Sequence, residues 1–266
     1  MFLLETALPL GTIFLSETVG TAMLLLLGAG VCCAVSFNDS KAQGSGWLVI
    51  NFGWAFAVFC GVMVAQPSGA HLNPAVTLGL WIKQFASGAA AEETYSFAQV
   101  AIYIIAQFVG AFIGSLLCWL AYKKQFDEDQ PAGSKLGVFS TGPTIRSYGW
   151  NLVTEMIGTF VLVFVIIMFS TVGKGGQAGV IGPLSGLGVA FLILVLGTSL
   201  GGPTGYAINP ARDLGPRIFH AVWPIPNKGD SDWSYAWVPV VGPILGGIVA
   251  GLAGAGLVAA YLPVLG

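Results

Sequence analysis

Two related stretches decide the fold that this sequence predicts. The first reads Ser68-Gly69-Ala70-His71-Leu72-Asn73-Pro74-Ala75-Val76, and the second reads Thr204-Gly205-Tyr206-Ala207-Ile208-Asn209-Pro210-Ala211-Arg212-Asp213. Each contains a small hydroxyl residue, a glycine, three variable residues and then Asn-Pro-Ala. Asparagine is a favoured helix N-cap and proline is favoured at the first helical position. Each stretch therefore predicts the start of a helix.

The helices that follow these stretches are expected to be short. The apolar runs Val76–Ile82 and Leu214–Val222 cannot cross a bilayer, which takes about 20 residues. Two half-length helices in corresponding places of an apolar chain indicate an inverted repeat that meets in the middle of the membrane. A second internal match supports the duplication, because Glu17–Thr21 and Glu155–Thr159 both read Glu-x-x-Gly-Thr.

Composition indicates a polytopic membrane protein, since 55% of the residues are hydrophobic and only 8% are charged. The sequence predicts an all-α membrane protein with six transmembrane helices and two half-helices in an inverted 3+3 repeat. A single channel domain is expected over 1–266, with a first repeat at 12–122, a linker at 123–149 and a second repeat at 150–262. The expected spans are Thr12–Val35, Trp47–Ala65, Phe97–Tyr122, Leu152–Val172, Val180–Leu200 and Tyr235–Tyr261.

Several function classes are disfavoured by the residues present. A net charge of −2 does not suggest a nucleic-acid partner, and the four cysteines lie in apolar runs, where we interpret them as buried side chains. His71 and His220 have no partners at ligand spacing, so no metal site and no cofactor are expected. The sequence shows no nucleophile–base pair and no phosphate-binding loop, so we do not expect an enzyme.

Two acids, Glu17 and Glu155, lie well inside predicted spans, where a charged group is costly and usually functional. They could carry protons in an ion-coupled transporter, or accept hydrogen bonds from the non-helical backbone before each half-helix. Their symmetric placement favours the acceptor role. His71, in the turn before the first half-helix, is expected to line or support that turn.

The two half-helix N-termini are expected to meet at the centre of a pore. Each carries a partial positive charge, and Asn73 and Asn209 add amide donors, which together would exclude protons and cations. Arg212 is interpreted as a pore-facing donor at a constriction, with snorkelling to the interface as the alternative. Asp213 suits the positive end of its helix.

These motifs resemble the aquaporin family, and specifically its glycerol-facilitator branch. The similarity covers roughly Glu17 to Tyr261 and rests on both Asn-Pro-Ala boxes, on the Glu-x-x-Gly-Thr pairs and on the Asn209–Asp213 run. The resemblance implies a homotetramer with one pore per subunit in the cell membrane, and a cytoplasmic N-terminus. It also assigns a central constriction to Asn73, Pro74, Ala75, Asn209, Pro210 and Ala211, and a selectivity filter to Trp54, Gly197, Tyr206 and Arg212.

Two filter positions depart from the glycerol-channel pattern. Tyr206 stands where those channels usually carry phenylalanine, and Trp54 aligns only if one residue is missing before Gly69; otherwise Gly53 takes the position. Gly197 is expected to leave the room that a histidine fills in water-selective members. The Tyr206 hydroxyl either adds polarity to the filter or turns aside, and in both cases a hydrogen-bond partner is expected.

The expected function is passive conduction of glycerol, other small neutral solutes and water, with protons and ions excluded. Urea and undissociated hydroxy acids are further candidate solutes. The count of lysine and arginine residues favours an external N-terminus. We nevertheless expect both termini to be cytoplasmic and 123–149 to be external, because the apparent excess lies mostly in that linker and in one large loop.

Overall fold

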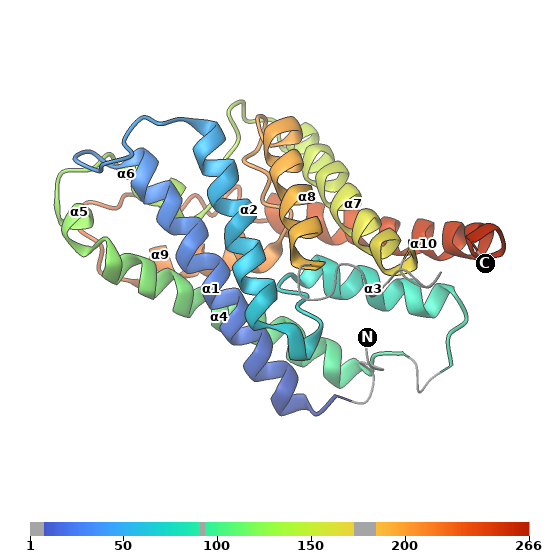
Figure 1. Ribbon diagram of the computed structural model, residues 1–266. Coiled ribbons are helices and arrows are strands. Elements are labelled where there is room, and N and C mark those ends of the chain that lie inside the picture. The colour runs from blue at the N-terminus through green and yellow to red at the C-terminus, as the bar shows by residue number, and fades with distance from the viewer. Residues whose placement is uncertain (1–7, 91–93, 173–184, 266) are drawn as a thin grey trace.

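The computed structural model describes residues 8–90, 94–172 and 185–265, and these residues form helices and loops with no β-strand among them (Figure 1). The two half-helices begin at the predicted prolines. A short 3₁₀ turn, Gln66–Ser68, precedes the first of them. The α-helices are α1 (Leu10–Ser36), α2 (Trp47–Val64), α3 (Pro74–Ala86), α4 (Phe97–Ala121), α5 (Lys123–Asp127), α6 (Ala132–Phe139), α7 (Tyr148–Val172), α8 (Ser185–Leu200), α9 (Pro210–Val222) and α10 (Val238–Leu265).

Within the described ranges, five helices are long and apolar enough to cross a membrane, namely α1, α2, α4, α7 and α10. The predicted span Val180–Leu200 corresponds to α8, whose described part begins at Ser185; residues 180–184 of that prediction lie outside the described chain. The last span begins at Val238 rather than at Tyr235. The backbone between them makes turns, in which Tyr235 N donates to Asp232 O and Val238 N donates to Tyr235 O.

The predicted linker 123–149 is not a featureless polar loop, because it contains α5 and α6, and α7 already begins at Tyr148. Apolar side chains anchor it. The ring of Phe126 packs edge-on against Phe37, the residue after α1, at 4.8 Å and stacks on Phe139 of α6 at 5.6 Å. Lys135 is fully buried, and its ammonium donates to the carbonyl of Pro226 at 2.7 Å.

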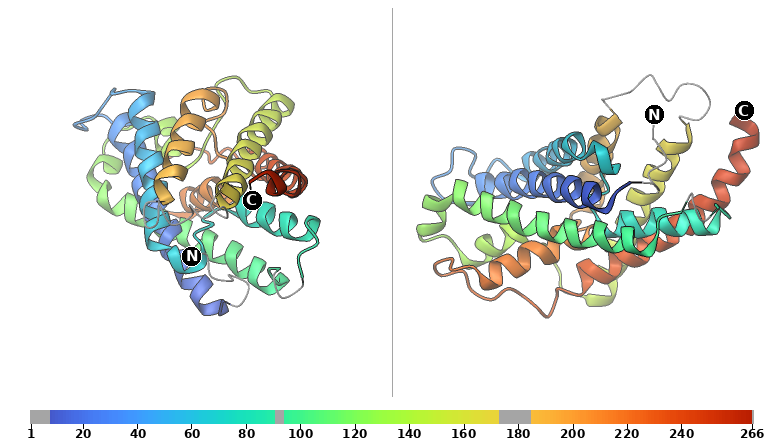
Figure 2. Two further views of the ribbon diagram at one scale, coloured as in Figure 1. Left: turned by 45° about the vertical axis from the view of Figure 1, so that its right-hand side comes forward. Right: turned by 90° about the horizontal axis from the view of Figure 1, so that it is seen from below.

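The helices pack in a pattern that repeats between the two halves of the chain. In the first half α1 lies along α4, and in the second half α7 lies along α10 (Figures 1 and 2). Each half-helix packs against the last long helix of the other half, α3 on α10 and α9 on α4. The halves therefore interlock around α3 and α9 rather than standing side by side.

Glycines allow these close helix crossings. A Cβ atom on Gly110 of α4 would lie 2.4 Å from the carbonyl oxygen of Thr18 on α1. On α10, a Cβ on Gly246 would lie 2.3 Å from Met156 O of α7, and one on Gly251 would lie 2.4 Å from Gly79 O of α3. Small residues at such contacts let backbones approach closely.

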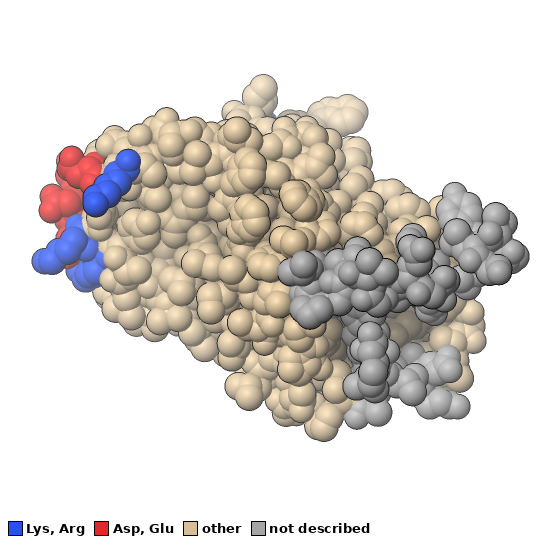
Figure 3. Space-filling view, in the orientation of Figure 1, with Lys and Arg blue, Asp and Glu red and all other residues tan. Residues whose placement is uncertain are grey.

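Charged side chains gather at one end of the face shown in Figure 3, the end that carries α5 in Figure 1. The rest of the described part of that face is uncharged. Along the helices, large apolar side chains such as Leu15, Phe191 and Leu252 are exposed. An uncharged band with exposed apolar side chains is what contact with lipid requires.

Candidate functional site

The two asparagines of the Asn-Pro-Ala boxes cap their own helices, as the sequence predicts. Asn73 Oδ1 accepts from Ala75 N at 2.9 Å. Asn209 Oδ1 accepts from Ala211 N at 3.0 Å and from Arg212 N at 3.1 Å. Each bond satisfies an N–H that would be left unpaired at a helix start.

The same asparagines join the two halves of the chain. Asn73 Nδ2 donates to Ile208 O, and Asn209 Nδ2 donates to Leu72 O, both at 2.8 Å. The sequence prediction treated both amides as donors to solute and missed this reciprocal pair. Because an amide carries two N–H groups, each asparagine can bridge the halves with one and still present the other to the pore.

The backbone before each half-helix is held in an unusual conformation. Ala70 and Leu72 have φ of 56° and 53°, and Tyr206 and Ile208 have φ of 39° and 43°. Non-glycine residues in this region are strained by about 1–3 kcal/mol each, so surrounding contacts must hold them. The conformation repeats in both halves, which indicates that the two segments serve the same purpose.

Glu17 and Glu155 supply those contacts. The Glu17 carboxylate accepts from His71 N at 2.9 Å and from Leu72 N at 2.7 Å. Glu155 accepts from Ala207 N at 3.0 Å and from Ile208 N at 2.8 Å. The acceptor role predicted for both glutamates requires these hydrogen bonds. Their donors are the strained residues Leu72 and Ile208 and the residues just before them.

Side chains complete the shell around Glu17. Ser68 Oγ donates to its carboxylate at 2.6 Å and Gln107 Nε2 donates at 2.8 Å. Gln107 was not among the site residues predicted from the sequence, although a glutamine inside an apolar span indicates a buried polar partner. The carboxylate therefore has four donors and is fully buried.

His71 is a support for the turn and has contacts on both ring nitrogens. Nδ1 lies 3.1 Å from Thr77 Oγ1, and Nε2 lies 3.3 Å from Tyr95 Oη. The ring stacks on Tyr103 with centroids 4.2 Å apart. These contacts fix the imidazole against α3 and α4.

Arg212 and Trp54 lie against one another. The guanidinium carbon is 3.9 Å from the centroid of the Trp54 ring, and Nη1 donates to Phe139 O at 3.2 Å. Gly53 faces away from this place, because a Cβ on it would lie 2.5 Å from Val31 of α1. Trp54, and not Gly53, therefore stands beside Arg212.

Tyr206 lies in the same layer. Its ring meets Trp47 edge-on at 5.8 Å, and it is 7% exposed. Its hydroxyl has no hydrogen-bond partner within the described residues, so the expected partner is not supplied by that part of the chain. Together with Trp54 and Arg212, it lines a cavity of about 360 Å³ that also contacts Ser140 and Thr141.

Gly197 does not leave open room, so the sequence expectation was wrong on this point. A Cβ at this position would lie 2.2 Å from Asn51 Oδ1 and 2.7 Å from Tyr206 Cζ. The space beside Gly197 is therefore filled by an amide from α2 and by the phenol ring. Gly197 lies behind Tyr206 and is not part of the cavity lining.

Asp213 organises the loop that reaches Arg212. Its Oδ2 accepts from Thr141 N at 2.6 Å and from Thr141 Oγ1 at 2.7 Å. Its Oδ1 accepts from Arg217 Nη2 at 2.8 Å, and both side chains of this ion pair are fully buried. The sequence prediction placed Asp213 at the positive end of its helix and missed its ion pair with Arg217. The spacing could have indicated that pair, because an acid and a base four residues apart on one helix lie on the same face.

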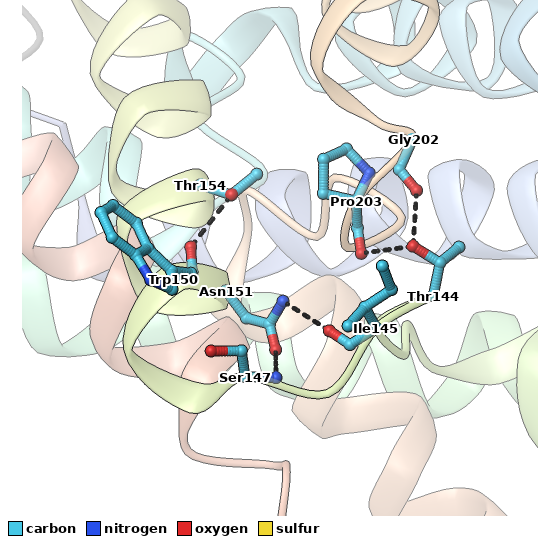
Figure 4. A pocket seen from close by; sticks show the side chains of 8 residues that line it. All are labelled: Thr144, Ile145, Ser147, Trp150, Asn151, Thr154, Gly202 and Pro203. Carbon is cyan, nitrogen blue, oxygen red and sulfur yellow. Dashed lines mark hydrogen bonds between the residues drawn. The ribbon is translucent and has the colours of Figure 1, made fainter.

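A second cavity of about 480 Å³ lies away from these residues (Figure 4). Its polar groups bond to each other: Ser147 N donates to Asn151 Oδ1, and Thr144 Oγ1 donates to the carbonyl of Pro203. No group of three metal-ligating side chains occurs among the described residues. The asparagine pair and the Arg212 layer are therefore the site that we consider for function.

Comparisons with known proteins agree with this geometry. A family model described as "Major intrinsic protein" matches residues 7–253. The chain is 49% identical to glycerol uptake facilitator protein 3 of Lactiplantibacillus plantarum, over 92% of this chain and 96% of that protein. It is 48% identical to a probable glycerol uptake facilitator protein of Thermotoga maritima, over 90% and 96% of the two chains.

A solved structure is also similar. The X-ray structure of the aquaglyceroporin from Plasmodium falciparum matches with a TM-score of 0.77 and 28% sequence identity, covering 97% of this chain and 99% of that chain. The arrangement of long helices and half-helices is therefore that of aquaporins. On the family match and these identities, the chain belongs to the major intrinsic protein family.

Proposed function

We propose that this protein is a passive channel for glycerol and other small neutral solutes, and also for water. The observation that carries the proposal is the layer formed by Trp54, Tyr206 and Arg212. Two aromatic rings offer apolar contact to a carbon backbone, while the guanidinium donates hydrogen bonds to hydroxyl groups. An alditol has CH groups along one side and OH groups along the other, so it satisfies both. The relatives' names, as glycerol uptake facilitators, support the same solute class.

The proposal includes the exclusion of protons and ions at the asparagine pair. The N-termini of α3 and α9 meet there, each with a partial positive charge that repels cations. A water that accepts from both amides cannot easily receive a proton as well. Urea and undissociated hydroxy acids are neutral, so this field does not bar them.

We expect purified protein in liposomes to conduct glycerol without any ion gradient. After a hyperosmotic glycerol shock, vesicles holding the channel should shrink and then re-swell faster than empty vesicles of the same lipid. The measurement is stopped-flow light scattering, repeated with urea and with a protonated hydroxy acid. Ordinary water shrinkage with no solute-dependent recovery in any small polyol would refute the assignment.

We further propose a homotetramer in the cell membrane, with two repeats, 12–122 and 150–262, joined by an external linker at 123–149. Both termini would then be cytoplasmic. The lysine and arginine count opposes this orientation, but the excess lies mostly in that linker and in the large loop before the last span.

Cysteine labelling tests the orientation. Asp129 is exposed in the loop between α5 and α6, whereas Lys135 is buried and unsuitable. We expect Asp129→Cys to react with an impermeant maleimide on intact cells. Ser87→Cys, on the exposed turn after α3, is the matched control and should react only after permeabilisation. The reverse pattern would place the termini outside.

A further inference from the structure

One wall of the cavity that holds Arg212 is bare helix backbone. Gly133 and Gly137 of α6 both line this cavity, and both are exposed. They are four residues apart, so they lie on the same face of the helix. On this side of the cavity, a solute therefore meets glycine backbone and not side chains.

The usual reasons for glycine do not apply at these two positions. Glycine destabilises the interior of a helix relative to alanine, yet α6 has two glycines in only eight residues. A Cβ atom on Gly133 or Gly137 would have no heavy atom within 4 Å, unlike one on Gly110 or Gly246, and neither residue has a positive φ. Neither close packing nor backbone conformation requires glycine here. An added side chain would instead occupy the free space of the cavity.

The other face of α6 is buried and holds the helix in place. Lys135, Val138 and Phe139 are buried, and helical periodicity places them opposite the two glycines. Lys135 Nζ donates to Pro226 O at 2.7 Å, and the Phe139 ring lies 5.3 Å from that of Phe219 on α9. A helix anchored in this way cannot easily move aside to make room for a side chain on its glycine face.

The group that a solute must reach lies close to this wall. Arg212 lines the same cavity and is 7% exposed. Its side chain makes one hydrogen bond with the described residues, to the carbonyl of Phe139, which is two residues after Gly137. A guanidinium carries five N–H donors, so most of them remain for a solute. The room left by the glycines is therefore room beside the filter arginine.

We propose that Gly133 and Gly137 are specificity-determining residues, which keep the cavity wide enough for a polyol to present its hydroxyl groups to Arg212. This inference rests on the proposed function and deepens it. A polyol must place its hydroxyl groups toward the guanidinium and its carbon chain toward Trp54, whereas a water molecule has no such requirement and needs less space. Side chains on the glycine face should therefore slow a polyol more than they slow water.

The test uses the full chain in proteoliposomes with the variant Gly137→Leu, measured by stopped-flow light scattering. We expect the ratio of glycerol to water permeability to fall about tenfold, the effect of a steric overlap of ordinary size. Gly137→Ala adds a single methyl group and should give a smaller fall. Erythritol, which is longer than glycerol, should be slowed more than glycerol by both variants.

Two control variants separate width from other effects. Gly149, near the start of α7, is also an exposed glycine whose Cβ would meet nothing within 4 Å, but it does not line the cavity. Gly149→Leu should therefore keep the wild-type ratio. Gly137→Gln adds a side chain of similar size to leucine that is polar. It should lower the ratio as Gly137→Leu does, because both remove room.

Thermal unfolding distinguishes a role in selectivity from a role in the fold. Alanine is a better helix former than glycine, and its methyl group would meet no other atom at position 137. We expect Gly137→Ala to unfold at the same temperature as the wild type or at a higher one, although its glycerol-to-water ratio is lower. A lower unfolding temperature, with equal loss of both fluxes, would mean that the fold itself requires this glycine and would overturn the inference.

Other outcomes would also overturn it. An unchanged ratio in Gly137→Leu, with both fluxes intact, would mean that solutes do not use this room. A wild-type ratio in Gly137→Gln beside a low ratio in Gly137→Leu would assign the effect to polarity and not to width. If Gly137→Leu does not fold, Gly137→Ala and Gly133→Ala give the ratio instead. Absence of glycerol flux in the wild type would refute the proposed function, and is read before any variant.

Discussion

Replacing Glu17 by leucine is expected to abolish the folded channel. The change leaves the buried backbone N–H groups of His71 and Leu72 without an acceptor. Ser68 Oγ and Gln107 Nε2 each lose one of two acceptors and keep Ala65 O and Thr77 Oγ1. Each unpaired donor costs about 1–3 kcal/mol, so the two backbone groups together cost about 2–6 kcal/mol. That is a large part of the stability of about 5–15 kcal/mol of a typical protein.

The measurement is the yield of monodisperse protein after detergent extraction, followed by its thermal unfolding. Glu17→Gln keeps one acceptor oxygen and should retain more folded protein than Glu17→Leu. A proton carrier would behave differently. Well-folded Glu17→Leu protein that had lost only a pH dependence of solute flux would contradict the support role and favour ion-coupled transport.

Replacing Asp213 by leucine is expected to have the second largest effect. The Arg217 guanidinium, which is fully buried, would lose its ionic partner, and breaking such a pair costs about 3–5 kcal/mol. Thr141 would also lose both of its bonds to Oδ2. Since Phe139, two residues before Thr141, accepts from Arg212, solute selectivity should weaken along with stability.

The chain offers a matched control for this prediction in Asp232→Asn. Asp232 pairs with Arg146 at 2.5 Å, but both side chains are partly exposed, and such pairs contribute about 0–1 kcal/mol. The unfolding temperature should fall much less than in Asp213→Leu. Adding Arg217→Leu to Asp213→Leu should recover part of the loss, because the buried guanidinium left without its ionic partner is then removed as well. Equal destabilisation by the two acid variants would contradict the argument.

The sequence predicted the local structure at the boxes because the chemistry there is local. Proline after asparagine determines where α3 and α9 begin, and the structure confirms both starts. Five of the predicted spans, those that correspond to α1, α2, α4, α7 and α10, were predictable for the same reason, since length and hydropathy suffice. Hydrogen bonds between the glutamates and the non-helical segments could be predicted, because a buried carboxylate requires donors and unwound backbone N–H groups require acceptors.

What the sequence could not supply were contacts between distant residues. Gln107 meets Glu17, and Asn51 fills the space at Gly197, only because helices cross there. The hydropathy of the linker gave no indication that Lys135 would be buried. Its burial depends on a hydrogen bond from its ammonium to the carbonyl of Pro226, in the loop after α9. In each case a tertiary partner reverses what the residue type alone suggests.

The reciprocal bonds between the boxes constrain the order in which the channel can fold. They join residues 135 and 137 positions apart, so neither bond can form while only the first half has been synthesised. Until α9 is in place, the Asn73 amide and the Leu72 carbonyl lack these partners inside the membrane. Contacts of such large sequence separation form late, after local helices. The centre of the pore is thus completed last, and a chain halted after the first half would hold a half-helix with no counterpart to close against.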